Sequence, residues 1–474
     1  MGEAAGDTPS VASGNAIERR RIVVRGVVQG VGFRPFVHRL ATRWKLGGFA
    51  LNDGRGVIVE VEGDPVVLGL FEGELVEDAP PNASVEEVAT SQVAPRGERE
   101  FRIEASSGDP AGALIPPDIA TCEECLRELW DPADRRHRYP FINCTHCGPR
   151  LTIALRAPYD RANTTMAGFE MCEACRAEYE DPVDRRFHAE PIACPDCGPR
   201  LSMPLEDVVD LLRGGAIVAV KGLGGYHLAC DATDEAAVAR LRKRKHREAK
   251  PLAVMTSDPE AIADLDDRER ELLAGSAAPI VLVRRRYPSA VAGSVAPGTE
   301  WLGVMLPYTP LHHLLCADLG RPLVMTSGNR SDEPIATEDG EARERLGGIA
   351  DVFLSHDRPI HRRCEDSVVR RRLHIRRSRG ITPQAIALSG SPSPILAVGA
   401  EQKSTFCLVR DGRAFLSPHL GDLDSPLAYE AFRSDLALYL QMLGLEPELI
   451  AHDLHPDYLS TRWALEQGIE TIAV

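Results

Sequence analysis

The sequence predicts a multidomain α+β protein, and three observations lead to this prediction. Strand and helix patterns alternate near the N-terminus, four Cys-x-x-Cys pairs stand in the middle, and a second αβ pattern follows them. A chain of 474 residues with 43% hydrophobic and 26% charged residues is long enough for three or four domains, each with its own core. We therefore expect several folded units.

The first unit is predicted over residues 20–108, after a segment 1–19 that is expected to be disordered. A strand at 22–24 leads into a glycine-rich turn and then a helix from Pro35 to about Leu46. Further strands and one helix are expected at 49–51, 57–61, 66–77 (the helix), 85–90 and 101–104. This β-α-β-β-α-β order predicts a ferredoxin-like fold.

The glycine-rich turn is a candidate anion site. Gly30 and Gly32 allow the backbone to curl so that successive N–H groups point inward at the start of a helix, and Arg34 adds a charged fork. A phosphate would fit there, although most such turns only change the chain direction. The residues of the candidate loop are Gln29, Gly30, Val31, Gly32 and Phe33.

The second unit, residues 109–202, contains a tandem repeat of a four-cysteine pattern. The second pair of Cys-x-x-Cys motifs repeats the first at an offset of 50 residues, with matching Asp-Pro-x-Asp-Arg-Arg and Cys-Gly-Pro-Arg-Leu flanks. This spacing predicts two structural zinc sites, each closed by four thiolates. A disulfide framework is the alternative, and it would need an oxidising compartment. The ligands are Cys122, Cys125, Cys144, Cys147, Cys172, Cys175, Cys194 and Cys197.

The third unit, residues 203–390, begins with a helix at 205–213 and a buried strand at 216–220. The loop 221–231 follows the strand as a ligand-binding loop would, yet it matches neither a Walker motif nor a dinucleotide motif. Two runs of basic residues, 241–250 and 362–379, are typical of solvated faces or of patches that bind polyanions.

Composition also limits the partners. A net charge of −15 disfavours a protein that coats nucleic acid, and aromatic residues are sparse around the cysteines. No stretch has the apolar length needed to cross a bilayer, and residues 1–15 lack a signal-peptide pattern. We therefore expect a cytoplasmic protein that binds neither nucleic acid nor membranes.

Two units resemble known families. The segment 26–34 resembles the acylphosphatase signature, which implies that Arg34 binds a phosphoryl group and that Asn52 orients the attacking water. Segments 250–255, 279–283, 302–310 and 325–329 resemble the YrdC-like domain, which binds ATP and makes carbamoyl-type adenylates. That resemblance implies that Lys245, Arg247 and Lys250 hold phosphates, that Ser327 and Asn329 line the nucleotide cleft, and that Arg376 closes it.

The order of these units resembles the HypF family of carbamoyltransferases in [NiFe]-hydrogenase maturation. Residues 391–474 are similar to the start of that family's C-terminal domain of actin-like ATPase fold, which in other members continues further, so little transfer is expected from this chain. The resemblance implies hydrolysis of carbamoyl phosphate, formation of carbamoyl-AMP from ATP with Mg²⁺, and transfer to a cysteine of a HypE-type acceptor. A tRNA threonylcarbamoyl-AMP synthase is the alternative, since it uses the same kind of domain.

Overall fold

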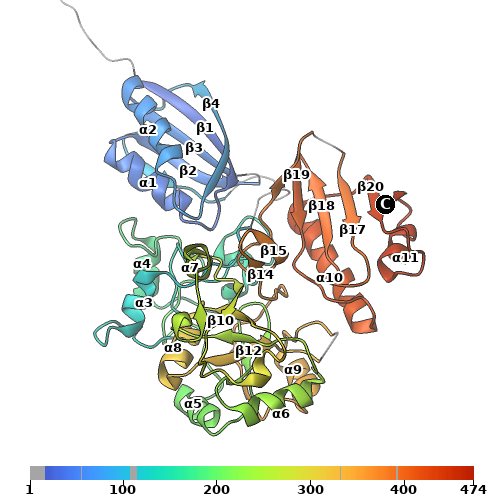
Figure 1. The fold of residues 1–474 in the computed structure, drawn as a ribbon. Coiled ribbons are helices and arrows are strands. Elements are labelled where there is room, and N and C mark those ends of the chain that lie inside the picture. Colours follow the sequence, from blue (N-terminus) through green and yellow to red (C-terminus); the bar gives the residue numbers. More distant parts are fainter. Residues whose placement is uncertain (1–16, 55, 107–114, 331–332, 391–392) are drawn as a thin grey trace, which may run out of the picture.

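The computed structural model describes residues 17–54, 56–106, 115–330, 333–390 and 393–474, which form four units (Figure 1). In this view the N-terminal unit, in blue, stands above a module of loops and short helices, in cyan. That module packs on an α/β unit in green and yellow, and the C-terminal unit, in orange and red, lies beside them. The multidomain α+β architecture predicted from the sequence is confirmed.

The N-terminal unit is a five-stranded sheet with two helices. Its strands lie in the order β4-β1-β3-β2-β5, and both β1 and β2 run antiparallel to β3, so they end at the same edge of the sheet. The predicted ferredoxin-like order is therefore present. Its elements are β1 (Glu18–Val27), α1 (Phe33–Arg43), β2 (Gly47–Asp53), β3 (Gly56–Gly63), α2 (Pro65–Glu77), β4 (Ser84–Val93) and β5 (Phe101–Ile103).

The start of β1 corrects one sequence prediction. Segment 1–19 was predicted to be disordered, but β1 begins at Glu18, and the remainder up to residue 16 lies outside the described residues. The reason is a buried cluster of charges, in which the fully buried guanidinium of Arg19 pairs with Glu60, Glu62 and Glu98 at 2.8–3.1 Å. A buried arginine with such partners holds the strand in register.

The cysteine-rich module has little regular structure. It contains the helices α3 (Glu123–Trp130) and α4 (Glu173–Glu180), each of which begins directly after the first cysteine of a repeat. Two short 3₁₀ turns, η1 (Arg161–Asn163) and η2 (Thr165–Gly168), lie between the repeats. The remaining chain is shaped by turns around the cysteines, so the metal sites must supply much of the stability.

The α/β unit is built on a ten-stranded mixed sheet, in the order β13-β6-β7-β12-β8-β11-β10-β14-β15 with β9 beside β10. Its helix α5 begins and ends where the sequence predicted. The elements are α5 (Leu205–Arg213), β6 (Val218–Lys221), β7 (Tyr226–Asp231), α6 (Glu235–Lys245), β8 (Ala253–Met255), η3 (Pro259–Ala261), β9 (Ala263–Asp264), α7 (Asp267–Ala274), β10 (Ile280–Arg285), η4 (Gly293–Val295), β11 (Trp301–Met305), α8 (Pro310–Leu319), β12 (Leu323–Ser327), α9 (Asp339–Leu346), β13 (Val352–Leu354), β14 (Val368–Arg370) and β15 (Leu373–Arg376).

The C-terminal unit is a six-stranded sheet in the order β16-β19-β18-β17-β20-β21. Strand β16 belongs to it although the sequence placed the boundary after residue 390, because two residues of β16 pair with β19. Among the described residues, none of the helices is long and apolar enough to cross a membrane. The elements are β16 (Ile386–Ala387), β17 (Ile395–Val398), β18 (Phe406–Arg410), β19 (Arg413–Leu416), α10 (Pro426–Leu443), β20 (Leu449–His452), α11 (Leu459–Leu465) and β21 (Glu470–Ala473).

Candidate functional site

The eight cysteines form two compact clusters, as the repeat predicted. Within each cluster the four sulfur atoms lie within 4.8 Å of one another. Neighbouring Sγ atoms of the first cluster are 3.5–3.9 Å apart, and those of the second are 3.6–3.8 Å apart. A tetrahedral zinc with bonds of about 2.3 Å would place its sulfur ligands about 3.8 Å apart. The geometry of both clusters therefore fits zinc.

Arginines of each repeat donate hydrogen bonds to a cysteine of the other repeat and so connect the two clusters. Arg135 and Arg136 of the first repeat donate to Cys175 Sγ at 3.2 and 3.5 Å, and Arg185 of the second donates to Cys125 Sγ at 3.3 Å. Ion pairs also cross between the repeats. Arg135 and Arg136 pair with Glu178 of the second repeat, and Arg185 and Arg186 pair with Glu128 of the first. Because guanidinium groups stabilise thiolate charge, each metal cluster relies on the other repeat.

The glycine-rich loop lies where β1 meets α1. Gly30 and Gly32 adopt φ values of 65° and 79°, which favour glycine, and Gly32 caps the helix. The Gln29 amide donates to the carbonyls of Asp53 and Gly56, both at 2.8 Å, which ties the loop to the end of β2. The predicted curled backbone is therefore present at the N-terminus of α1.

Arg34 is buried, at 8% exposure, against two acidic residues that the sequence analysis missed. Its Nη2 donates to Asp160 Oδ1 at 3.1 Å and to Glu190 Oε1 at 3.2 Å, both from the cysteine-rich module. Glu190 breaks the 50-residue repeat, since the first repeat has Pro140 there, and this departure was the available signal. The two carboxylates therefore occupy some of the guanidinium N–H donors of Arg34 that an oxyanion would use.

Glu190→Gln is expected to flatten the pH dependence of stability. Burial raises the pKa of Glu190 from 4.5 to about 7, although Arg34, the Tyr179 hydroxyl and the Arg161 N–H favour its charged form and Asp160 disfavours it. The folded chain binds this proton more tightly than the unfolded chain does. Stability from this group is therefore full below about pH 4.5 and is lost as pH rises through about 7.

The shift corresponds to about 3 kcal/mol of unfolding free energy. Denaturant unfolding at about pH 5 and about pH 8 measures this, and the wild-type chain should lose more stability between them than the Glu190→Gln variant. Equal losses in both proteins would show that Glu190 is ionised throughout this range.

Asn52 lies near the end of β2, fully buried, and neither its Oδ1 nor its Nδ2 has a hydrogen-bond partner. A buried amide without partners is costly and is rarely kept for structural reasons. Because β1 and β2 end at the same edge of the sheet, Asn52 lies at the edge that carries the candidate anion-binding loop. Its amide is available for a ligand or a water molecule.

A second candidate site is a cavity of about 280 Å³ in the α/β unit. Four of the predicted nucleotide-binding residues line it, namely Arg247, Lys250, Ser327 and Arg376. Apolar side chains of the sheet, among them Leu282 and Met325, form part of the wall. Cationic groups beside an apolar wall are the features that a mononucleotide needs.

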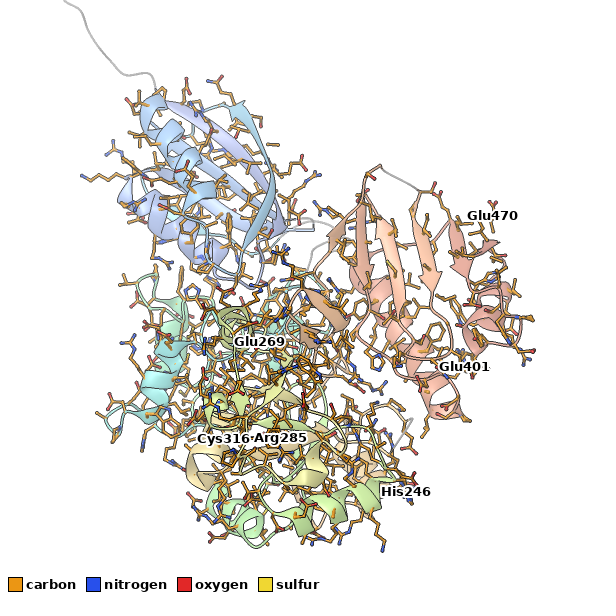
Figure 2. The ribbon with its side chains drawn as sticks, in the orientation of Figure 1. His246, Glu269, Arg285, Cys316, Glu401 and Glu470 are labelled. Carbon is orange, nitrogen blue, oxygen red and sulfur yellow. The ribbon has the colours of Figure 1, made fainter. Side chains whose placement is uncertain are left out.

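Two other predicted nucleotide-binding residues, Lys245 and Asn329, do not line this cavity. The buried Lys245 ammonium donates to the carbonyl of Ser327 at 2.7 Å and to Asn329 Oδ1 at 2.6 Å, and burial lowers its pKa to about 7. Lys245 thus braces the loop after β12, next to His246, which Figure 2 labels at the end of α6. Asn329 lines the adjoining cavity described next, together with Lys250 and Arg376.

A network of His227, Asp366 and Arg379, from two segments that the sequence did not connect, borders the cavity of about 280 Å³. His227 Nε2 lies 2.9 Å from Asp366 Oδ2, and Arg379 Nε donates to Asp366 Oδ1 at 2.8 Å. Although burial acts in the opposite direction, the neighbouring Arg379 and the hydrogen bond from His227 hold the pKa of Asp366 well below its usual range. The segment 221–231 was expected to be a loop, but its second half is strand β7, and His227 in this strand is held in position by a buried carboxylate.

The adjoining cavity, about 470 Å³, lies between the α/β unit and the C-terminal unit. Lys403, His419 and Asp422 line it from the C-terminal side. Burial lowers the pKa of His419 to about 4, so the imidazole is neutral at physiological pH. The cavity of about 280 Å³ shares Lys250, Glu365 and Arg376 with this space, so the two cavities adjoin at these residues.

Comparison with family models matches the units in order. Residues 20–103 match the acylphosphatase family, 121–154 and 171–203 match the HypF finger, 210–378 match the Sua5/YciO/YrdC family described as telomere recombination, and 390–474 match the HypF Kae1-like domain. The fold and the two cysteine clusters thus define a multidomain protein with an acylphosphatase unit, zinc fingers and a YrdC-like unit.

Similar proteins have the same arrangement. The chain is 50% identical to carbamoyltransferase HypF2 of Cupriavidus necator and 47% identical to carbamoyltransferase HypF of Synechocystis, over 96% and 94% of its length. A crystal structure of full-length HypF in a phosphate- and nucleotide-bound form superposes with a TM-score of 0.95 at 44% identity, over 97% of this chain. The chain belongs to the HypF family. It spans 62%, 61% and 63% of the lengths of these three proteins.

Proposed function

We propose that this chain acts in carbamoyl transfer for [NiFe]-hydrogenase maturation, by hydrolysing carbamoyl phosphate and capturing the carbamate on ATP. The proposal is supported by two candidate anion sites of different kinds on one chain, the loop before Arg34 and the cavity beside Arg247. The related HypF structure in a phosphate- and nucleotide-bound form supports both ligands.

The first step takes place at the N-terminal unit. Arg34 and the loop N–H groups bind the phosphoryl group of carbamoyl phosphate, and the Asn52 amide orients a water molecule. Attack of water breaks the bond between the carbamoyl group and phosphate, which yields carbamate, inorganic phosphate and a proton. Carbamate decomposes in water, so we expect an enclosed route to the second site.

The second step takes place in the nucleotide cavity. A carbamate oxygen attacks the α-phosphorus of ATP, and the bond to the β-phosphate breaks to give carbamoyl-AMP and pyrophosphate. Arg247, Lys250 and Arg376 stabilise the charge on the leaving pyrophosphate, and Mg²⁺ would accompany ATP. The C-terminal cysteine thiol of a HypE-type acceptor then attacks the carbamoyl carbon at the C-terminal unit, and the bond to AMP breaks to give the thiocarbamate, AMP and a proton.

The test is the conversion of ATP to AMP by zinc-loaded protein, with and without carbamoyl phosphate. We expect pyrophosphate release only when both substrates are present. Release of pyrophosphate with threonine and bicarbonate, and not with carbamoyl phosphate, would instead support the tRNA threonylcarbamoyl-AMP synthase alternative. That alternative rests on the YrdC-like unit alone.

A further inference from the structure

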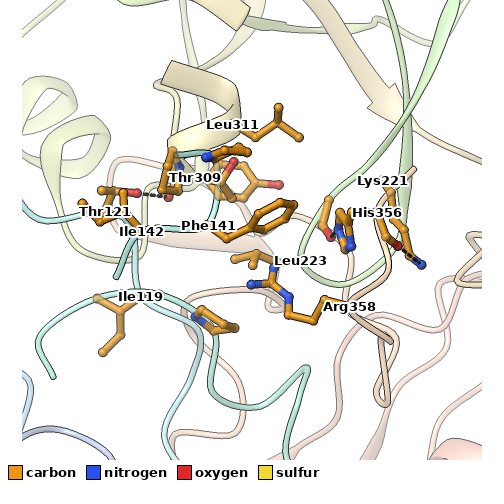
Figure 3. Close-up of a pocket in the computed structure, with 16 residues that line it drawn as sticks. Ile119, Thr121, Phe141, Ile142, Lys221, Leu223, Thr309, Leu311, His356 and Arg358 are labelled. Atoms are coloured by element: carbon orange, nitrogen blue, oxygen red, sulfur yellow. Dashed lines mark hydrogen bonds between the residues drawn. The ribbon is translucent and has the colours of Figure 1, made fainter. Parts of the chain in front are cut away.

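A third cavity lies where the zinc module meets the α/β unit (Figure 3). Ile119, Phe141 and Pro149 contribute from the module, and Leu223 and Tyr308 contribute from the α/β unit. The cavity is narrow, about 20 Å³, so it accepts a ligand of a few heavy atoms and excludes a nucleotide. It belongs to neither of the two sites described above.

The only uncompensated charge among the described residues that line this cavity is that of Arg358. Its side chain is 6% exposed, and its guanidinium lies over the Phe141 ring at 5.3 Å. Within the described residues no carboxylate comes within ion-pair distance of it, whereas Lys221, in the same wall, is paired with Asp339 at 2.6 Å. Burial holds the pKa of His356 well below its usual range, so that imidazole adds no charge.

A buried guanidinium without a counter-charge is costly unless an anion joins it. Planar carboxylates fit its fork through two parallel hydrogen bonds. Apolar and aromatic walls on the other sides strengthen such a contact by excluding water. The chemistry of this cavity therefore suits one small planar carboxylate-type anion.

The cavity lies between the two proposed reaction sites. On one side the carbonyl of Pro149 accepts a hydrogen bond from the Tyr159 hydroxyl at 3.1 Å. The Tyr159 ring in turn packs on Gly30, so closely that a Cβ atom added to Gly30 would lie 2.8 Å from the ring. On the other side a Cβ on Gly222 would lie 3.0 Å from the His227 ring, which lines the nucleotide cavity. One aromatic side chain on each side separates this cavity from a reaction site.

We propose that Arg358 forms an intermediate binding site for carbamate on its way from the phosphate-binding loop to the nucleotide cavity. This inference rests on the proposed function. Arg358 holds the carboxylate of carbamate away from water and reacts with nothing, so it is a positioning residue.

The test compares the full chain with its Arg358→Met and Arg358→Lys variants in three rates: phosphate release from carbamoyl phosphate, pyrophosphate release driven by carbamoyl phosphate, and pyrophosphate release driven by added ammonium carbamate. We expect Arg358→Met to lower the second rate about 10- to 100-fold, since two charge-assisted hydrogen bonds are lost. The first and third rates should stay within about twofold of wild type. Arg358→Lys keeps the charge and should give an intermediate second rate.

Two results would overturn the proposal. An equal fall in both pyrophosphate rates would place Arg358 at the adenylation site or in the fold, and an unchanged second rate would leave it without a role in transfer. Arg358→Lys keeps the test valid if the methionine variant does not fold. Failure of the proposed function would look different, because the wild-type chain itself would then release no pyrophosphate with carbamoyl phosphate.

Discussion

Asn52→Ala is expected to lower carbamoyl phosphate hydrolysis by about 10²- to 10³-fold while leaving the fold as stable as before. The loss follows because the amide would orient the attacking water. Stability is kept because the buried amide has no hydrogen-bond partner to lose. Phosphate release and the midpoint of thermal unfolding measure the two effects.

Asn143 offers a matched control for this variant. It is equally buried, but its Nδ2 donates to the carbonyls of Phe141 and Pro191, both at 2.9 Å. Asn143→Ala should therefore lower stability by about 1 to 3 kcal/mol. A stable Asn52→Ala protein with normal hydrolysis would rule out a catalytic role for Asn52.

Arg34→Ala should be equally inactive, yet it is a less specific test. Removing the guanidinium leaves Asp160 and Glu190 without their counter-charge, which costs about 3 to 5 kcal/mol for a buried pair. A loss of activity could then arise because the cysteine-rich module, which carries Asp160 and Glu190, is displaced. Arg34→Lys keeps the charge without the fork, so it should retain stability better than activity.

Cys147→Ser is expected to remove zinc from the first cluster and to weaken zinc binding at the second. The first effect follows from the loss of one of four ligands, since structural zinc contributes about 10 to 16 kcal/mol to folding. The second follows from the reciprocal arginines, because Arg135 and Arg136 are positioned by the first repeat and donate to Cys175 Sγ. Metal content and chelator competition measure both effects.

Cys407→Ser is the matched control, since this cysteine lies in β18 outside both clusters. It should keep two zinc ions per chain. If Cys147→Ser left the second site with wild-type affinity, the two clusters would be independent. That result would remove any structural importance from the arginine contacts across the repeats.

The sequence predicted most of what depends on local pattern. The repeat of cysteine pairs predicted both clusters, and the strand and helix periods predicted the order of the N-terminal unit and the bounds of α5. Two errors concern the limits of units, at Glu18 and β16, where long-range pairing and not local sequence decides the structure. The segment β16 has only two residues, and β1 opens with the charged run 18–21, so in neither place does an alternation of apolar and polar residues indicate a strand.

Contacts between residues far apart in the sequence could not be predicted in this way. Nothing local links Arg34 to Glu190, which is 156 residues away, or His227 to Asp366, which is 139 residues away. Arg358 lies outside both basic runs, so nothing in the sequence singled it out, whereas the structure buries its side chain at a cavity. Such pairings depend on tertiary packing, and the residue pattern of a single segment carries no information about that packing.

Arg150 connects the metal clusters with the N-terminal unit. Its buried guanidinium donates to the carbonyls of Cys144, Thr145, Cys147 and Pro149 around the first cluster, and to Gly30 at 2.6 Å. The glycine-rich loop is therefore tied by one side chain to the backbone around the first cysteine cluster. Loss of zinc from the first cluster is therefore expected to disturb the glycine-rich loop of the N-terminal unit as well as the cysteine-rich module.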